Sequence, residues 1–233
     1  MDAKNILPFN VEEIPNSSFN VFLGRRRSGK SILVEYLLKQ MVANKMLDLV
    51  FLFSPTDSGF EMIDKNSRFK DIDVLETIVE NFRLMTEYNK SKKKKREKIG
   101  VRCMIILDDF AVKLKTKSFN ILETLAVNGR HLGVSPLALH FCILSQSLTK
   151  IPRVVRLNTD HIFLNSIGSS MELNMILDEN FYILDGSRQG KNDGRKLYND
   201  LIVQEDYQFI VVENWRQNVR EYKDYVKTYR AIL

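Results

Sequence analysis

Cysteine, histidine and long apolar runs are scarce in this 233-residue sequence. Its two cysteines, Cys103 and Cys142, lie inside apolar stretches, so we expect small core residues there rather than a metal or redox pair. No apolar run approaches the roughly 18 residues that a membrane-spanning helix needs. The N-terminus, MDAKNILPFNVEEIP, lacks the basic flank and apolar core of a signal peptide. These features argue against a disulfide-rich secreted protein and against a membrane-spanning one.

The composition is that of a globular chain, with 44% apolar and 27% charged residues. The length suits one α/β domain and is sufficient to bury a full core. Lysine and arginine number 35 against 29 aspartates and glutamates, which gives a net charge of +6. This mild basic bias permits a polyanionic partner but does not demonstrate one.

The most informative stretch, residues 19–34, reads FNVFLGRRRSGKSILV and contains the pattern GxxxxGK[ST]. An apolar strand-like run precedes the pattern and a helical apolar pattern follows it, which is the context of a nucleotide phosphate loop. Glycines allow successive backbone N–H groups to face a phosphate, and the helix N-terminus adds a partial positive charge. The predicted nucleotide-binding residues are Gly24, Arg27, Ser28, Gly29, Lys30 and Ser31. A glycine turn that joins a strand to a helix without any ligand would give the same spacing.

Two aspartates follow a second buried strand, residues 101–110, which reads VRCMIILDDF. Ligands of open α/β sheets bind at the carboxyl ends of the strands, so we expect Asp108 and Asp109 beside the phosphate loop. Asp108 is predicted to hold Mg²⁺ together with the Ser31 hydroxyl, and Asp109 to orient or deprotonate an attacking water. The alternative is a strand-end turn in which an aspartate caps the next helix.

A third strand, residues 137–144, ends in Ser-Gln-Ser. Gln146 is therefore predicted to sense the γ-phosphate from the same edge of the sheet, although a loop-capping amide would also fit. The order of strands and helices predicts an α/β fold with a mostly parallel central sheet flanked by helices.

The remaining elements are predicted from periodicity and breakers. Helices are expected at 31–44, 71–88, 118–131 and 171–179, and further strands at 46–54 and 161–164. The C-terminal part is expected to contain a glycine-rich loop at 186–194, a hairpin of strands 197–203 and 207–212, and a polar helix at 215–233.

With the phosphate loop, IILDD, NGRH and ILSQS in this order, the chain resembles the FtsK–HerA superfamily of DNA-pumping ATPases. Within it, the chain is most similar to the genome-packaging ATPases of large DNA viruses and virophages, the poxvirus-type enzymes. The segments FSPT, IPR and RLNTD extend the resemblance over roughly residues 19–164. It implies a RecA-like P-loop ATPase core. Together with the sequence pattern, this predicts an extended segment 1–18 followed by one ATPase domain, 19–233, with the C-terminal hairpin and helix as an appendage that matches the family only loosely. The resemblance also implies ATP and Mg²⁺ as cofactors.

The resemblance further implies a homo-oligomeric ring, a pentamer or hexamer, that moves double-stranded DNA into a capsid. Capsid or other packaging proteins are then candidate partners. The expected location is the assembly site in the host cytoplasm, with the virion as a second candidate. Lys30 matches the phosphate-binding lysine and Asp108 the second acidic motif. Asp109 takes the place of the catalytic carboxylate, which is often glutamate in cellular members, and Gln146 matches the polar sensor. Arg130 matches an arginine finger that reaches a neighbouring subunit's nucleotide. Arg130 would otherwise be a helix-end cation favoured by the helix dipole.

Two basic stretches, 92–98 and 188–195, are candidates for contact with DNA phosphates, and each could equally be a solvated surface. Arg25, Arg26 and Arg156 have no role assigned from spacing. Two other functions use the same phosphate loop: a phosphotransferase acting on a nucleotide or small molecule, and a non-catalytic nucleotide-gated scaffold. The paired aspartates with a glutamine at the next strand tip favour water as the phosphoryl acceptor.

Overall fold

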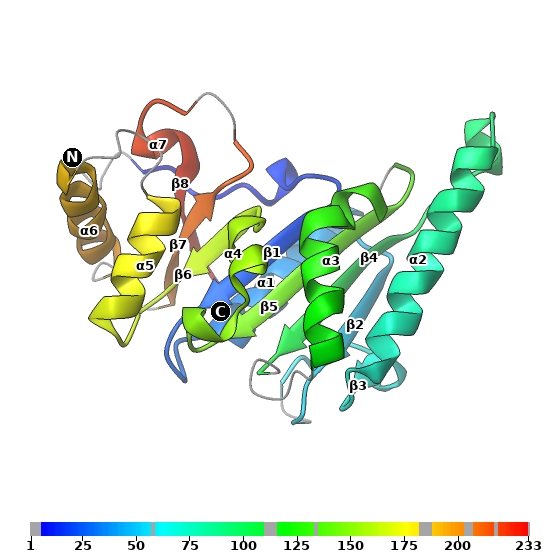
Figure 1. The fold of residues 1–233 in the computed structure, drawn as a ribbon, viewed down its shortest axis with the longest axis horizontal. Helices are drawn as coiled ribbons and strands as arrows, with labels where there is room; N and C mark the ends of the chain where they lie inside the picture. The colour runs from blue at the N-terminus through cyan, green and yellow to red at the C-terminus, as the bar shows by residue number, and fades with distance from the viewer. Residues whose placement is uncertain are drawn as a thin grey trace.

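The computed structural model describes residues 6–56, 59–109, 116–132, 135–181, 188–202, 207–216 and 219–232. These residues form an eight-stranded sheet with helices on both faces, in the order β3-β2-β4-β5-β1-β6-β7-β8 (Figure 1). Strands β1 to β6 run parallel, and β7 and β8 continue the sheet as antiparallel strands. The predicted α/β class with a mostly parallel sheet is confirmed.

The strands are β1 (Ser18–Leu23), β2 (Leu49–Phe53), β3 (Arg68–Phe69), β4 (Arg102–Asp108), β5 (Ala138–Ser145), β6 (His161–Leu164), β7 (Gln208–Glu213) and β8 (Val226–Arg230). The helices are α1 (Lys30–Ala43), α2 (Asp73–Ser91), α3 (Thr116–Leu132), α4 (Arg153–Leu157), α5 (Ser170–Asn180), α6 (Arg188–Ile202) and α7 (Tyr222–Tyr225). Up to β6 and α5, the predicted helices and strands are confirmed to within a few residues at their ends.

Two hydrophobic layers cover the two faces of the sheet, because alternate residues of a strand point to opposite sides. Phe19, Val21 and Leu23 of β1 face the layer that contains helices α2 to α7. Phe22 faces the other layer, where α1 packs through residues such as Leu37. Figure 1 shows α2 to α5 across the near face and α1 behind the sheet. A strand buried on both faces reads as a continuous apolar run, which is why β1, β4 and β5 were recognisable in the sequence.

Both cysteines are core residues, as expected. Cys103 of β4 and Cys142 of β5 are free and fully buried, on opposite faces of the sheet. Burial raises the pKa of each thiol to about 12, which keeps it protonated and unreactive. Among the described helices, none is both long enough and apolar enough to cross a bilayer.

In the first half of the C-terminal part, residues 186–203, the structure differs from the prediction. The expected glycine-rich loop 186–194 and the expected strand 197–203 are wrong over the described residues 188–202, which form helix α6. Gly194 does not mark a loop but a close approach between helices. A Cβ at Gly194 would lie 3.3 Å from Phe181 Cβ, so α6 can lie tightly against the end of α5. Residues 186, 187 and 203 lie outside the described part of the chain.

The second half also differs. Residues 208–213 form a strand as expected, but β7 pairs with β6 and β8 instead of a strand at 197–203. The expected helix 215–233 is wrong over the described residues 215, 216 and 219–232, of which only Tyr222–Tyr225 is helical and Val226–Arg230 is strand β8. Val226 and Tyr229 are both buried in β8, so pairing with the edge of the existing sheet removes their apolar side chains from water.

A buried polar chain crosses strands β5, β1 and β6 near their amino ends. The Trp215 indole N–H donates to His161 Nε2 at 2.9 Å, so the proton of this neutral histidine sits on Nδ1, which donates to Asn20 Oδ1 at 2.8 Å. Asn20 Nδ2 donates to Ser18 Oγ at 2.9 Å, and Ser18 Oγ lies 2.9 Å from His140 Nδ1. The polar side chains in this core are therefore hydrogen-bonded to one another.

Candidate active site

The phosphate loop joins the end of β1 to the start of α1 and is hydrogen-bonded to the end of β5 and to the segment after β6. The Gly24 N–H donates to Ser145 O at 3.3 Å, and the Arg25 N–H donates to Ser166 O at 3.1 Å. Gly29 precedes α1 with a φ of 84°, and Arg27 has a φ of 63°. These left-handed conformations turn the backbone sharply before the helix begins, as an anion-binding loop requires.

Lys30 lies beneath this loop. Its Nζ donates to the carbonyl oxygens of Gly24 and Arg25 at 2.8 and 3.0 Å, and the side chain is almost buried. Burial lowers the pKa of Lys30, and the nearby carboxylates of Asp109 and Asp108 oppose that change. The ammonium group is thus held between the loop and the acidic pair.

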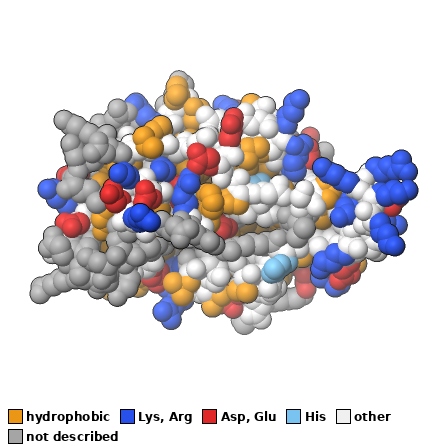
Figure 2. All heavy atoms as spheres, turned by 90° about the horizontal axis from the view of Figure 1, so that it is seen from above, with side chains coloured by type: hydrophobic (Ala, Val, Ile, Leu, Met, Phe, Trp, Pro, Cys, Tyr) orange, Lys and Arg blue, Asp and Glu red, His pale blue; other side chains and the backbone are white. Residues whose placement is uncertain are grey.

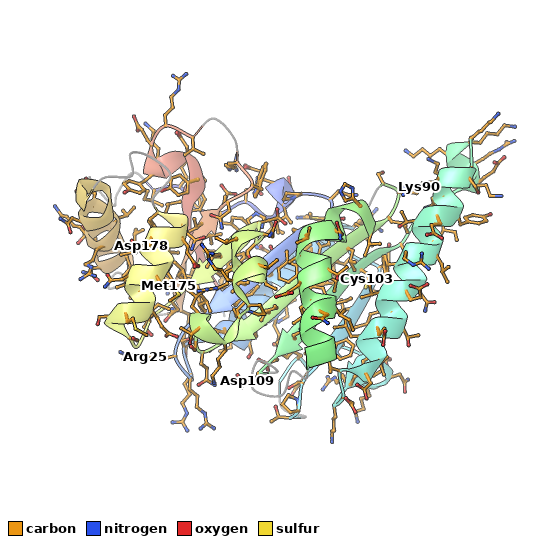
Figure 3. All side chains as sticks on the ribbon, in the orientation of Figure 1. Arg25, Lys90, Cys103, Asp109, Met175 and Asp178 are labelled. Atoms are coloured by element: carbon orange, nitrogen blue, oxygen red, sulfur yellow. The ribbon has the colours of Figure 1, made fainter. Side chains whose placement is uncertain are left out.

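The acidic pair lies at the end of β4, beside the loop. Burial, reinforced by the negative charge of Asp109 and opposed by Lys30, raises the pKa of Asp108 to about 6. Asp109 is exposed and has a φ of 53°, which turns the chain away from the strand. Gln146 Nε2 donates to Asp109 Oδ1 at 3.3 Å. Figure 3 shows Asp109 at the same edge of the molecule as Arg25 of the phosphate loop.

The register of the sheet explains why these side chains meet. Asp108 is paired with Leu144 of β5, and Leu144 with Phe22 of β1, so the three strands end at one edge. Gln146 comes two residues after that pairing. The predicted convergence in space of the lysine, the aspartates and the glutamine is confirmed, because all four side chains line one cavity.

A cavity of about 570 Å³ opens among these residues. Its lining includes Arg27, Ser28, Gly29, Lys30, Ser31, Asp108, Asp109 and Gln146. Gly24 contributes its carbonyl oxygen to Lys30 from beneath the cavity. Ser28 Oγ is buried and makes no hydrogen bond with the residues that the structure describes. A phosphate oxygen in the loop would satisfy that hydroxyl.

The donor set also fits a divalent cation of the Mg²⁺ type. The Ser31 hydroxyl and the Asp108 carboxylate line the same cavity and are hard oxygen ligands. The described residues contain no group of three or more His, Cys, Asp or Glu side chains arranged for a metal. Mg²⁺ commonly binds through one or two carboxylates plus substrate phosphates and water, so two protein ligands suffice here.

The backbone of Arg130 lies away from this cavity. Its backbone lies near the C-terminal end of α3, and its side chain is outside the described part of the chain. The adjacent Gly129 lies beside Ser17 and Ser18, at the amino end of β1, whereas the cavity lies at the carboxyl end. Arg130 is thus at the edge of the sheet opposite to its own chain's phosphate loop, and its role as a finger stays a prediction.

Tyr207 lines the cavity and was missed in the sequence. It immediately precedes β7, which runs antiparallel to β6 and so begins where β6 and β1 end. No motif marks it; only the topology brings it to the phosphate loop. Thr56 and Gly59, from the segment after β2, also line the cavity.

Arg156 forms an ion pair between two helices. It extends from α4 to α5, where Nη1 lies 3.4 Å from Glu179 Oε1 and 2.7 Å from Met175 Sδ. Only 10% of the Arg156 side chain and 16% of the Glu179 side chain is exposed. This half-hidden ion pair joins two helices and lies away from the cavity.

Comparison with known proteins identifies the family of this chain. The sequence matches the family model described as Poxvirus A32 protein over residues 7–182, well over half of the chain. A search of curated proteins found no match.

Several solved structures share the fold. The genome packaging NTPase B204 from Sulfolobus turreted icosahedral virus 2, in complex with sulfate, has a TM-score of 0.61 at 18% identity, covering 94% of this chain and 99% of that one. The pCW3 conjugation coupling protein TcpA, in its monomer form with ATPgS, has a TM-score of 0.60 at 12% identity, covering 98% and 70%. The cytoplasmic domain of the Thermomonospora curvata type VII secretion ATPase EccC has a TM-score of 0.57 at 15% identity, covering 93% and 25%. The chain belongs to the poxvirus A32 protein family, the poxvirus-type group of genome-packaging ATPases that its motifs predicted.

Proposed function

We propose that this protein is an ATP-hydrolysing motor that moves double-stranded DNA and packages a viral genome into a capsid. The observation that carries the proposal is the meeting of Lys30, Asp108, Asp109 and Gln146 around one cavity, in a chain of the A32 family. Solved structures of the similar packaging NTPase B204 with AMP, ATP-gammaS and AMPPCP support nucleotide binding by this fold.

Binding of the triphosphate would use the loop and its lysine. The backbone N–H groups that precede α1 would donate to phosphate oxygens, and the positive end of α1 would add to the attraction. Lys30 would keep its ammonium group beside the β- and γ-phosphates. Ser31 and Asp108 would hold Mg²⁺, which would supply positive charge to neutralise part of the negative charge on the phosphates.

Hydrolysis would use the exposed carboxylate of Asp109. Asp109 would orient a water and accept its proton as the water oxygen bonds to the γ-phosphorus and the bond to the ADP oxygen breaks. Gln146 fixes one Asp109 oxygen at 3.3 Å, which supports a role in positioning that carboxylate and in detecting the γ-phosphate. Lys30 would stabilise the negative charge on the phosphates during the reaction.

Completion of the site would come from a second subunit. Because the backbone of Arg130 lies at the edge opposite to its own cavity, its guanidinium would act on the nucleotide of a neighbour in a homo-oligomeric ring of five or six copies. We propose residues 19–233 as the ATPase domain and 1–18 as a leading segment. The site of action would be the place of virus assembly in the host cytoplasm.

A mixing experiment tests the shared site. Lys30→Ala and Arg130→Ala variants are each expected to be inactive, and their mixture to regain part of the ATPase rate, because some interfaces then combine an intact Lys30 with an intact Arg130. Co-assembly is verified separately by size-exclusion chromatography with light scattering. Assembled mixtures without any recovery would remove the trans-acting role of Arg130.

DNA would meet the chain through the lysine cluster, defined as Lys90, Lys92, Lys93, Lys94, Lys95, Arg96 and Lys98. This cluster covers the last turn of α2 and the turn after it, with side chains that are exposed or half-exposed. Figure 2 shows it as the blue end of the molecule, and Figure 3 shows Lys90 far from Asp109. None of the ion pairs among the described residues includes a side chain of this cluster, so these cations have no carboxylate partner there. Such a surface suits sequence-independent contact with phosphates.

The second basic stretch, 188–195, lies on helix α6, and the side chains of residues 188–191 are outside the described part of the chain.

Product analysis tests the proposed chemistry. Wild-type protein with ATP and Mg²⁺ is expected to release inorganic phosphate and ADP, and Asp109→Asn to lose turnover while still binding ATP. Transfer of the γ-phosphate to an acceptor would replace the proposal by a phosphotransferase. Binding without any turnover, with or without duplex DNA, would replace it by a nucleotide-gated scaffold.

A further inference from the structure

Tyr207 lies between two cavities at the protein surface and lines both. On one side it lines the 570 Å³ cavity of the phosphate loop. On the other it lines a larger groove of about 950 Å³, bounded by α1, β8 and the segment that precedes β1. Among the described residues, Tyr207 is the one that lines both.

The ring of Tyr207 lies directly against the phosphate loop. A Cβ at Gly29 would come within 2.5 Å of Tyr207 Cδ1, so the ring occupies the space beside the Gly29 backbone. Gly29 and Tyr207 both have positive φ angles, 84° and 58°. A left-handed tyrosine is uncommon and costs conformational energy, and such residues gather at ligand sites. In spite of this contact, 40% of Tyr207 is exposed.

The groove continues from Tyr207 along α1. Tyr36 and Gln40 line it from α1, and Tyr229 from β8, where its hydroxyl donates to Gln40 Oε1 at 2.7 Å. With a rise of 1.5 Å per residue, Tyr36 lies about 9 Å beyond Lys30 along the helix. A ligand whose phosphates are held at Lys30 and whose other end lies along α1 would meet Tyr207 first and then enter the groove.

We propose that Tyr207 stacks on the nucleobase of the bound nucleoside triphosphate and directs that base into the groove between α1 and β8. This rests on the proposed function, because it assumes that the phosphate loop holds a nucleotide. Every nucleobase has a π-face on which an exposed aromatic ring can stack, and truncating a stacked ring to alanine weakens binding by roughly tenfold or more. Tyr207 would then be a base-positioning residue, while phosphate binding stays with Lys30 and the loop.

The test compares a ligand that has a base with one that lacks it. Dissociation constants for ATP and for inorganic tripolyphosphate are measured by titration calorimetry on wild-type protein, Tyr207→Ala and Tyr207→Phe. Tyr207→Ala is expected to weaken ATP binding about tenfold and to leave tripolyphosphate binding within twofold. Tyr207→Phe, which keeps the ring, is expected to bind both ligands as wild type does. Equal weakening of both ligands in Tyr207→Ala would mean that the ring supports the loop, and no change in either would mean that it has no part in binding; each result overturns the proposal.

Two further results keep the test decisive. If Tyr207→Ala does not fold, as judged by its circular dichroism spectrum, Tyr207→Leu takes its place, since leucine keeps an apolar side chain without an aromatic face. Loss of ATP affinity alone in Tyr207→Leu supports stacking, and wild-type affinity for ATP overturns it. Wild-type protein that binds neither ATP nor tripolyphosphate would reject the proposed function itself and the inference with it. Wild-type protein that binds both, with variants that do not discriminate, would reject only the role of Tyr207.

Discussion

Gln146 at the tip of β5 donates a hydrogen bond to Asp109 at the tip of β4, with 3.3 Å between Nε2 and Oδ1. The two residues come from strands that are adjacent in the sheet but separated in the chain by helix α3. This contact joins the proposed catalytic carboxylate to the proposed sensor. Ser147, the residue after Gln146, also bonds through its hydroxyl to the Glu172 carboxylate of α5, so the strand tip is connected to the helix layer.

Removing the Gln146 amide is expected to slow catalysis more than binding. Gln146→Ala leaves Asp109 without this donor, and the loss of one oriented donor in an active site commonly lowers kcat by about 10²-fold or more. We expect that decrease in kcat with a KM for ATP within about threefold of wild type, measured by steady-state phosphate release. Asn66→Ala removes an exposed amide from a turn far along the chain and serves as the control. A normal kcat in Gln146→Ala would show that Asp109 does not depend on the amide.

Neutralising the lysine cluster is expected to weaken DNA binding and its salt dependence. Each phosphate contact with duplex DNA contributes about 0.9 to the slope of log Kd against log salt concentration. The quadruple variant Lys92→Gln, Lys93→Gln, Lys94→Gln and Lys95→Gln should lower that slope by up to about 4, measured by fluorescence anisotropy between 50 and 200 mM salt. The basal ATPase rate should be retained, because the cluster is far from Asp109 (Figure 3).

The matched control removes the same charge from dispersed exposed positions, Lys39, Lys45, Lys65 and Lys150. It separates the effect of this surface from the effect of net charge. If both quadruple variants lose the same affinity, DNA is attracted by overall charge and the cluster is an ordinary solvated surface.

Arg156 and Glu179 should matter for stability and not for catalysis. The pair is nearly enclosed between α4 and α5, and removal of one partner leaves the other charge without compensation. Breaking a buried pair in this way typically costs about 3–5 kcal/mol, and the residual exposure places Arg156→Met near the lower value. The double variant Arg156→Met, Glu179→Leu should recover most of that loss. Urea unfolding measures both, and an unchanged midpoint in Arg156→Met would leave the arginine free for another role.

Acid should destabilise the fold through two buried histidines. Burial lowers the pKa of His140 to about 4 and, reinforced by the charge on neighbouring groups, that of His161 to about 3, whereas an unfolded histidine has the ordinary pKa of about 6.5. Below that value the unfolded chain binds more protons, so stability falls as the pH is lowered from about 6.5 to 4. Each histidine contributes a slope of about 1.4 kcal/mol per pH unit in that range. His140→Gln should therefore show a shallower decline by about that amount, in urea unfolding curves recorded from pH 4 to 8.

The phosphate loop and the acidic strand could be predicted because their signals are local. Gly24 to Ser31 has fixed spacing, and β4 is an apolar run that must be a central strand, so Asp108 could be placed at the carboxyl edge before any coordinates. Gln146 followed from the same rule. Tyr207 could not be predicted, because it reaches the loop only through the antiparallel return of β7 along β6.

The C-terminal elements were mispredicted because local and tertiary preferences conflict there. Gly190 and Gly194 lower the helix propensity of their segment, yet Leu197, Tyr198 and Leu201 bury one helical face against the layer that contains α5. In the last segment, Tyr222, Tyr225, Val226 and Tyr229 have helical spacing, but an open sheet edge was available to pair with residues 226–230. In both segments the packing partner decided the conformation.

The most direct test of the central claim is the rate of phosphate release from ATP, with and without duplex DNA, in wild-type protein and in Lys30→Ala. Lys30 donates hydrogen bonds to two carbonyl oxygens of the phosphate loop, and the carboxylates of Asp109 and Asp108 lie near enough to influence its pKa. The account predicts ATP hydrolysis that duplex DNA accelerates in the wild type, and no turnover in a folded Lys30→Ala variant. Wild-type turnover in Lys30→Ala would contradict it.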